Sequence, residues 1–134
     1  MLSLTFVSHI AYTRKFDHVT DVISDELHWL PIEQHIEFKI CTIVYKCLHN
    51  MAPSYLANHI MPVESNVSRR CLRSAVRGDL VVPATRTCYG ARSFAVAGPR
   101  LWNNLPADIR DRSLSLALFR SKLKTHLFGV AYYC

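Results

Sequence analysis

Histidine and cysteine are the residue types in this chain best suited to metal binding or acid–base chemistry. The chain has seven histidines and five cysteines. None of the histidines, His28, His49 and His59 included, belongs to an H-x-x-x-H, H-E-x-x-H or Cys/His finger spacing. Cys41 and Cys47 are six positions apart in an expected helix and point in different directions. We therefore expect no metal site, and we interpret the cysteines as reduced, mostly buried thiols of an intracellular protein.

Nucleophiles and carboxylates do not form catalytic patterns either. There is no Gly-x-Ser-x-Gly motif, and with only four glycines a phosphate-binding loop is not expected. Ser121 and Lys124 spell S-x-x-K, but they lie on an expected amphipathic helix without any partner motif. Asp25 and Glu26, the one adjacent acidic pair, are interpreted as charge at a helix start. We expect no catalytic residue, no cofactor and no small-molecule substrate.

Arginine and lysine are concentrated in the second half of the chain. Residues 1–68 hold four Lys/Arg and seven Asp/Glu, a net charge of −3, whereas residues 69–134 hold twelve and three, a net charge of +9. This asymmetry favours an anionic partner, most commonly RNA or DNA, because guanidinium and ammonium groups match phosphate oxygens. The candidate nucleic-acid-binding residues are Arg69, Arg70, Arg73, Arg77, Arg86, Arg92, Lys122 and Lys124.

Other interpretations of these residues stay open. The arginines can be solvated loop residues, or they can face an acidic neighbouring domain. Tyr89, between Arg86 and Arg92, is a candidate for stacking on a base, although packing in the core is the default for an aromatic residue. The other aromatic residues expected in the core are Phe94, Trp102, Phe119 and Phe128.

Hydrophobic periodicity predicts mainly α structure, with a helical hairpin in the first half. Over residues 32–50 apolar side chains recur at steps of three and four, and Pro31 suits the start of such a helix. Asn50 can adopt the left-handed conformation that ends it. A short second helix is expected over residues 54–60, with Ser54 as its N-cap. No apolar run approaches the ~18–20 residues that span a bilayer, so no membrane association is expected.

The second half is expected to combine a short β-hairpin with amphipathic helices. Residues 80–83 and 85–89 predict the two strands of the hairpin. A short helix over 92–97 is expected to be interrupted at Gly98-Pro99. The last amphipathic helix is expected over about residues 115–128, with one face made by Leu116, Phe119, Leu123 and Leu127.

A chain of 134 residues has room for one domain, or for two small subdomains. Residues 1–13 are expected to be an unrelated leader. They lack the basic start of a signal peptide, so a signal peptide is the less favoured interpretation. The predicted units that follow are a helical subdomain (14–61), a basic linker (62–79), a mixed hairpin and helical subdomain (80–128) and a tail (129–134).

Ten short segments carry a resemblance to a known family. In the first half they are Arg14-Lys15-Phe16-Asp17-His18-Val19-Thr20, Leu27-His28-Trp29-Leu30-Pro31-Ile32, Phe38-Lys39-Ile40, Tyr45-Lys46-Cys47-Leu48-His49 and Ala52-Pro53-Ser54-Tyr55-Leu56. In the second half they are Leu72-Arg73-Ser74, Leu80-Val81-Val82-Pro83, Tyr89-Gly90-x-Arg92-x-Phe94, Pro99-x-Leu101-Trp102-Asn103-x-Leu105-Pro106 and Phe119-x-x-x-Leu123-Lys124-Thr125-His126-Leu127-Phe128.

In order and spacing, these segments resemble the region that follows the polymerase domain in non-LTR (LINE-type, jockey-like) retrotransposon reverse transcriptases. The resemblance runs from about Arg14 to Phe128. The chain departs from the family pattern at Asp21, where proline is usual, and at Asn50, where glycine is usual. The second departure is mild, because asparagine also tolerates the left-handed conformation.

The resemblance implies an accessory role without chemistry of its own. The family's Tyr/Phe-x-Asp-Asp polymerase motif and its endonuclease lie upstream of the matched region, and neither occurs in these residues. In that family the post-polymerase region is thought to help hold template RNA or target DNA. The resemblance therefore implies a nucleic-acid-binding region, cytoplasmic or nuclear, that is not an enzyme. Two other hypotheses stay open: a helical protein-interaction module that docks on a polymerase domain, and a relic of a mobile element without function.

Overall fold

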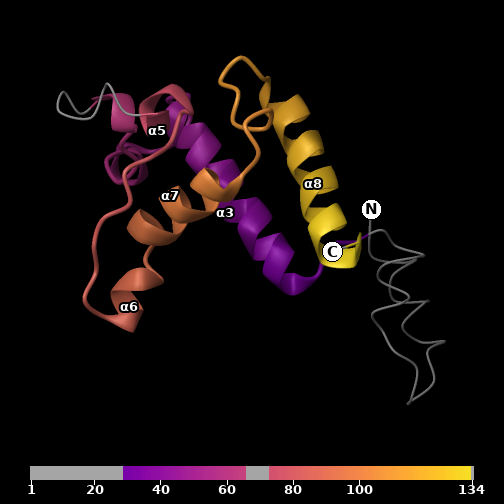
Figure 1. The fold of residues 1–134 in the computed structure, drawn as a ribbon, viewed down its shortest axis with the longest axis horizontal. Helices are drawn as coiled ribbons and strands as arrows, with labels where there is room; N and C mark the ends of the chain where they lie inside the picture. The colour runs from indigo at the N-terminus through magenta and orange to yellow at the C-terminus, as the bar shows by residue number, and fades with distance from the viewer. Residues whose placement is uncertain (1–28, 66–72, 134) are drawn as a thin grey trace.

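The computed structural model describes residues 29–65 and 73–133 (Figure 1). The predicted leader, residues 14–28 of the predicted helical subdomain and the candidates Arg69 and Arg70 lie outside the described residues. Within the described part the elements are α3 (Ile32–Leu48), α4 (Ser54–Ala57), the 3-10 helix η2 (Val63–Ser65), α5 (Arg73–Val76), α6 (Cys88–Ala91), α7 (Phe94–Asn104) and α8 (Leu116–Tyr133). The prediction of a mainly helical chain is confirmed for these residues.

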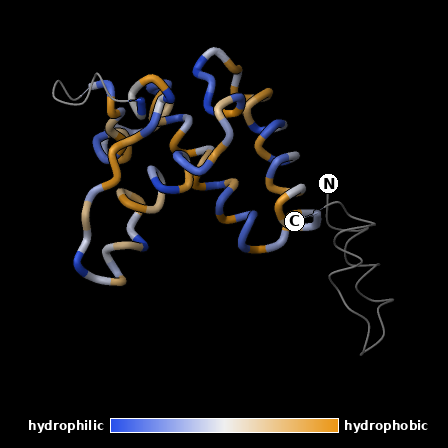
Figure 2. The backbone as a smooth tube through the Cα atoms, in the orientation of Figure 1, coloured by the Kyte–Doolittle hydropathy of each residue, from blue (hydrophilic) through white to orange (hydrophobic). Residues whose placement is uncertain are grey.

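Helix α3 is the centre of the fold, because both α7 and α8 pack against it (Figure 1). It begins directly after Pro31, and Asn50 follows its end with a φ of 56°, so both predicted boundary signals are confirmed. Figure 2 shows hydrophobic and hydrophilic residues alternating along α3 and α8, as expected for helices with one packed face.

Aromatic side chains from the three long helices meet in the core. The ring centroids of Tyr45 in α3 and Phe119 in α8 are 4.5 Å apart, and those of Phe119 and Trp102 in α7 are 5.7 Å apart. All three side chains are buried. Burial of such a side chain contributes about 1.5–3 kcal/mol, and stacked aromatic pairs add about 0.5–1.5 kcal/mol. The core positions predicted for Trp102 and Phe119 are confirmed.

Helix α3 buries the later part of the predicted apolar stripe, at Val44 and Cys47, but not its first residues. Its buried residues include Cys41, Val44 and Tyr45, whereas Ile32 and Ile36 are 80% and 53% exposed. The core cluster includes Val44 and Tyr45, whereas Ile32 and Ile36, on the first turns of α3, lie outside this cluster. The sequence stripe therefore marks the helix correctly but includes residues that the described core does not cover.

The predicted β-hairpin over residues 80–89 is wrong. Leu80 instead forms an isolated antiparallel bridge with Pro62, and the amide of Val81 donates to the carbonyl of Met61 over 2.8 Å. The side-chain amide of Asn103 forms hydrogen bonds with both backbone polar groups of Leu80. It accepts from the Leu80 amide over 2.8 Å and donates to the Leu80 carbonyl over 2.9 Å. A hairpin partner would find these groups already bonded.

The predicted interruption at Gly98-Pro99 is also wrong, because α7 runs continuously through both residues. A proline inside a helix removes one hydrogen bond and costs roughly 3 kcal/mol. Close packing offsets this cost: Pro99 is fully buried, and a Cβ added at Gly98 would lie 3.1 Å from Cγ2 of Val44. The glycine lets α7 approach α3 more closely than any other residue would allow.

Several helix boundaries differ from the prediction, most clearly those of α4 and α8. Helix α4 starts at Ser54 with Pro53 as its N-cap, so Ser54 is not the cap, and it ends at Ala57. Helix α8 continues beyond the predicted end at Phe128 to Tyr133. Among the helices of the described residues, none combines the length and the apolar character that crossing a membrane requires.

Candidate nucleic-acid interface

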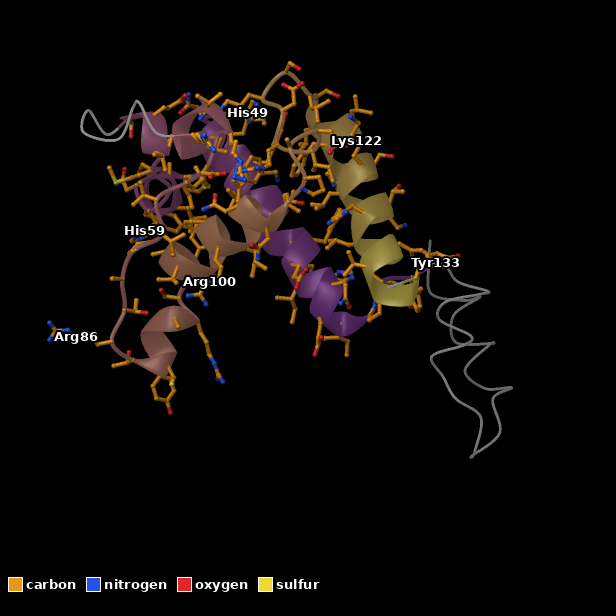
Figure 3. The ribbon with its side chains drawn as sticks, viewed as in Figure 1. His49, His59, Arg86, Arg100, Lys122 and Tyr133 are labelled. Atoms are coloured by element: carbon orange, nitrogen blue, oxygen red, sulfur yellow. The ribbon has the colours of Figure 1, made fainter. Side chains whose placement is uncertain are left out.

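The six candidate cations within the described residues lie in three separate places. Arg86 and Arg92 flank α6, Arg73 and Arg77 lie at α5, and Lys122 and Lys124 lie on α8. In Figure 3 Arg86 and Lys122 lie at opposite sides of the molecule. The structure therefore does not gather the predicted residues into one patch.

The segment around α6, residues 82–93, is called the α6 tip here. Every residue from 82 to 89 is exposed, so this segment lies outside the core. Local bonds nevertheless fix its conformation: Thr87 caps α6 by accepting from the Gly90 amide over 3.0 Å, and the Ser93 hydroxyl donates to the Gly90 carbonyl over 2.7 Å. A Cβ at Gly90 would lie 3.1 Å from the Thr87 hydroxyl oxygen, so a larger residue would crowd this turn.

The α6 tip is basic, because it contains arginines and no acidic residue. Arg86 and Arg92 are exposed, and Figure 3 shows the exposed Arg100 of α7 on the same side of the molecule as Arg86. No Asp or Glu occurs from Leu80 to Ala107. In the described part, none of these three arginines forms a salt bridge. Their charges are therefore available to an external anion.

The two candidate lysines on α8 do not form a common surface. Lys122 lines a groove together with Asp108 and His126, whereas Lys124 lines an apolar hollow with Phe128 and Tyr133. Residues two positions apart on a helix point to different sides. A single phosphate backbone would therefore contact one lysine or the other.

Arg77 lies in a cleft of about 620 Å³ in which charges of both signs alternate. Arg112 forms an ion pair with Glu64 over 2.6 Å, and the buried Arg110 pairs with Asp79. The carboxylate of Asp111 lines the same cleft. Hydrogen bonds from the backbone and side chain of Ser113 hold its pKa below the usual value. Because the acids neutralise the arginines, this cleft carries less net positive charge than the α6 tip.

Tyr89 is 86% exposed, so the expectation that it packs in the core is wrong. No hydrogen bond or ring contact of its side chain is found among the described residues. Its position between two exposed arginines is the feature that the alternative interpretation, stacking on a base, requires.

The cysteine thiols of the described residues differ in burial, as Tyr45 and Tyr89 do. Cys41 and Cys47 are buried, and burial raises the pKa of the Cys41 thiol to about 12, with a smaller contribution from Glu37. Burial also raises the pKa of Cys47. Cys88 at the α6 tip is free and exposed. Among the described residues no three His, Cys, Asp or Glu side chains are grouped so that they could hold a metal ion.

Arg100 is a surface cation that the sequence analysis does not single out. The signal that could have identified it is the acid-free stretch from Leu80 to Ala107, which contains Arg86, Arg92 and Arg100.

Comparisons with models of protein families, with curated proteins and with solved structures found no match to this chain.

Proposed function

We propose that these residues are a post-polymerase region of a LINE-type reverse transcriptase that binds RNA or DNA and has no catalytic activity of its own. The α6 tip and Arg100 form the contact surface, and α3, α7 and α8 form its scaffold. The family part of the proposal rests on the sequence resemblance from Arg14 to Phe128.

One observation carries the binding proposal: three exposed arginines occur on an acid-free stretch, without ion-pair partners in the described structure. Arg110 and Arg112, by contrast, pair with Asp79 and Glu64. An arginine that is not paired within the protein can release counterions from a phosphate backbone at little cost. Among the described residues, Arg110 and Arg112 are thus held in ion pairs, whereas Arg86, Arg92 and Arg100 are not.

Fluorescence anisotropy with a labelled oligonucleotide at several salt concentrations tests this proposal. Affinity is expected to fall linearly on a log–log plot, with a slope of about −0.7 for each phosphate neutralised on a single strand. The double variant Arg86→Ala/Arg92→Ala is expected to make the slope less negative by about 1.4. Both side chains are exposed, so the free energy of unfolding should change by less than about 0.5 kcal/mol.

The double variant Lys122→Ala/Lys124→Ala is the matched control, because it removes the same charge from α8. It is expected to change the slope by less than half as much, since its two cations do not share a surface. Equal effects of the two variants would show that net charge alone drives binding. Salt-insensitive binding, or nucleotide incorporation by the pure protein, would contradict the proposal outright.

A second candidate function is a protein-interaction module that docks on a polymerase domain. The observation that favours it is the exposure of Ile32 and Ile36 on the first turns of α3, because exposed isoleucines on a regular helix are typical of interfaces. Ile32→Ser/Ile36→Ser should then abolish capture of a purified LINE-type polymerase domain in the absence of nucleic acid. Binding that is unchanged in this variant would exclude these residues as the docking face.

A further inference from the structure

We propose that Tyr89 stacks on an unpaired base, so that the ligand of the α6 tip is single-stranded nucleic acid. This inference rests on the proposed function, since it specifies the ligand of the same surface. It begins from a side chain that the described core does not use: Tyr89 is 86% exposed, and no hydrogen bond or ring contact of its side chain is found among the described residues.

The backbone that carries Tyr89 is held in place although its ring is free. Tyr89 lies inside α6, between the cap at Thr87 and the bond from Ser93 to the carbonyl of Gly90. A ring on a fixed backbone loses little conformational freedom when it binds, so it is suited to serve as a stacking platform.

Cations flank the ring at matching distances along the chain. Arg86 precedes Tyr89 by three residues, and Arg92 follows it by three. Both guanidinium groups belong to exposed residues. A strand whose base lies on Tyr89 therefore has an arginine available for the phosphate on either side, which is the combination that non-specific single-strand binding proteins use.

An exposed ring of this kind discriminates between single and double strands. In a duplex both faces of each internal base are covered by neighbouring bases, so a tyrosine gains access only after a base is unstacked. The arginines, by contrast, can contact the phosphates of either form. The ring is thus expected to provide the preference for single strands, and the arginines the salt-dependent affinity.

The test compares four proteins, all as the full chain: wild type, Tyr89→Ala, Tyr89→Phe and Tyr133→Ala. Tyr133 is the matched control because it is 82% exposed and lies on the opposite side of the molecule from Arg86 (Figure 3). Each is titrated by anisotropy against single strands of about 12 nucleotides, as DNA and as RNA, and against a duplex of the same length.

Tyr89→Ala is expected to weaken single-strand binding by at least about fivefold and duplex binding by less than about twofold. Tyr89→Phe should keep the wild-type affinity, because the phenyl ring still stacks, and Tyr133→Ala should have no effect. Equal losses on both ligands, or no loss, would overturn the inference and leave the proposed function standing. If the wild-type protein bound none of the three ligands, both the proposed function and this inference would be refuted.

Photo-crosslinking gives an independent readout. A bromouracil-substituted single strand irradiated with the wild-type protein is expected to crosslink to Tyr89, as mapped by mass spectrometry. Crosslinks confined to Tyr133 or to α8 would contradict the proposal. No crosslink of Tyr89 to any oligonucleotide, together with crosslinks from the tip to a protein partner, would contradict the proposal. That result would identify the tip as a protein-binding surface, since Tyr and Arg also dominate such interfaces.

Discussion

The α6 tip and the three-helix body of α3, α7 and α8 use the same residue types in opposite ways. In the body Tyr45 is buried and stacks on Phe119, and Arg110 is buried against Asp79. At the tip Tyr89 is exposed, and Arg86 has no ion-pair partner in the described structure. Residue type alone therefore does not separate scaffold from binding surface; burial and pairing do.

The same contrast divides the segments of the resemblance: Tyr89 and Arg92 lie at the α6 tip, whereas Trp102 and Asn103 lie in the body. Trp102 and Asn103 belong to the Pro99–Pro106 segment of the resemblance. Trp102 donates through its indole nitrogen to the carbonyl of Gly78, and Asn103 holds both backbone groups of Leu80. These residues fix the chain that leads into the α6 tip, so under the proposed function their role is to support the surface.

Thiol reactivity should show the largest difference between tip and body. At about pH 8 the maleimide labelling of Cys88 should exceed that of Cys41 by at least about 1000-fold, because the thiolate is the reactive form and the pKa of Cys41 is raised to about 12. Mass spectrometry of labelled peptides measures both rates. As the pH rises from about 9 toward 12, the raised pKa of Cys41 should cost stability, because the unfolded thiol ionises first. Comparable labelling of the two thiols in native protein would contradict the burial of Cys41.

Truncation of the central core residue should have a far greater effect on stability than truncation at the tip. Trp102→Ala is expected to lower the free energy of unfolding by about 3–5 kcal/mol, because it removes a buried side chain and its stack on Phe119. Tyr89→Ala should change it by less than about 0.5 kcal/mol. Urea denaturation followed by circular dichroism gives both values. Similar losses for the two variants would mean that the tip is part of the core.

Asn103 and Asn104 offer a matched pair for the link between body and tip. Asn103→Ala is expected to cost about 2 kcal/mol, because the amide and carbonyl of Leu80 both lose their partner. Asn104 is exposed, and Asn104→Ala should be nearly neutral. Both are measured by the same denaturation experiment. Should Asn103→Ala prove neutral, the two hydrogen bonds would not explain the missing hairpin.

Two glycines distinguish close helix contact from open surface. Gly98→Ala is expected to destabilise the protein by about 1–3 kcal/mol, because the new methyl group would press on Val44 in α3. At Gly129 in α8 a Cβ would meet nothing within 4 Å. Gly129→Ala should therefore stabilise the protein by up to about 1 kcal/mol through helix propensity. Thermal denaturation checks the opposite signs, and equal signs would contradict the packing at Gly98.

The long helices could be predicted from the sequence because periodicity and boundary residues agree. Apolar spacing identifies α8 and its buried face, and Pro31 and Asn50 mark the ends of α3. Local rules failed where a distant contact overrides them. Pro99 stays helical because α7 packs on α3. Leu80 and Val81 form no hairpin because Asn103 binds both backbone groups of Leu80 and the Met61 carbonyl accepts from the Val81 amide. No short-range pattern encodes those contacts.

The candidate site was predictable in residue type but not in arrangement. The cluster of positive charge in the second half indicates a basic surface, and Arg86 and Arg92 are exposed as that requires. The sequence does not show that Lys122 and Lys124 face different sides or that Arg77 lies among acids. Those outcomes depend on how α5 and α8 are oriented by the core.

Backbone amide NMR during titration with a single-stranded oligonucleotide tests the central claim most directly. If the α6 tip binds and the body supports it, the largest chemical-shift changes will fall on residues 85–93 and on Arg100, and will be reversed by added salt. The amides of α3 and of the C-terminal half of α8 should stay unchanged. Shift changes centred on Ile32 and Ile36, or spread over α8 without the tip, would contradict the account.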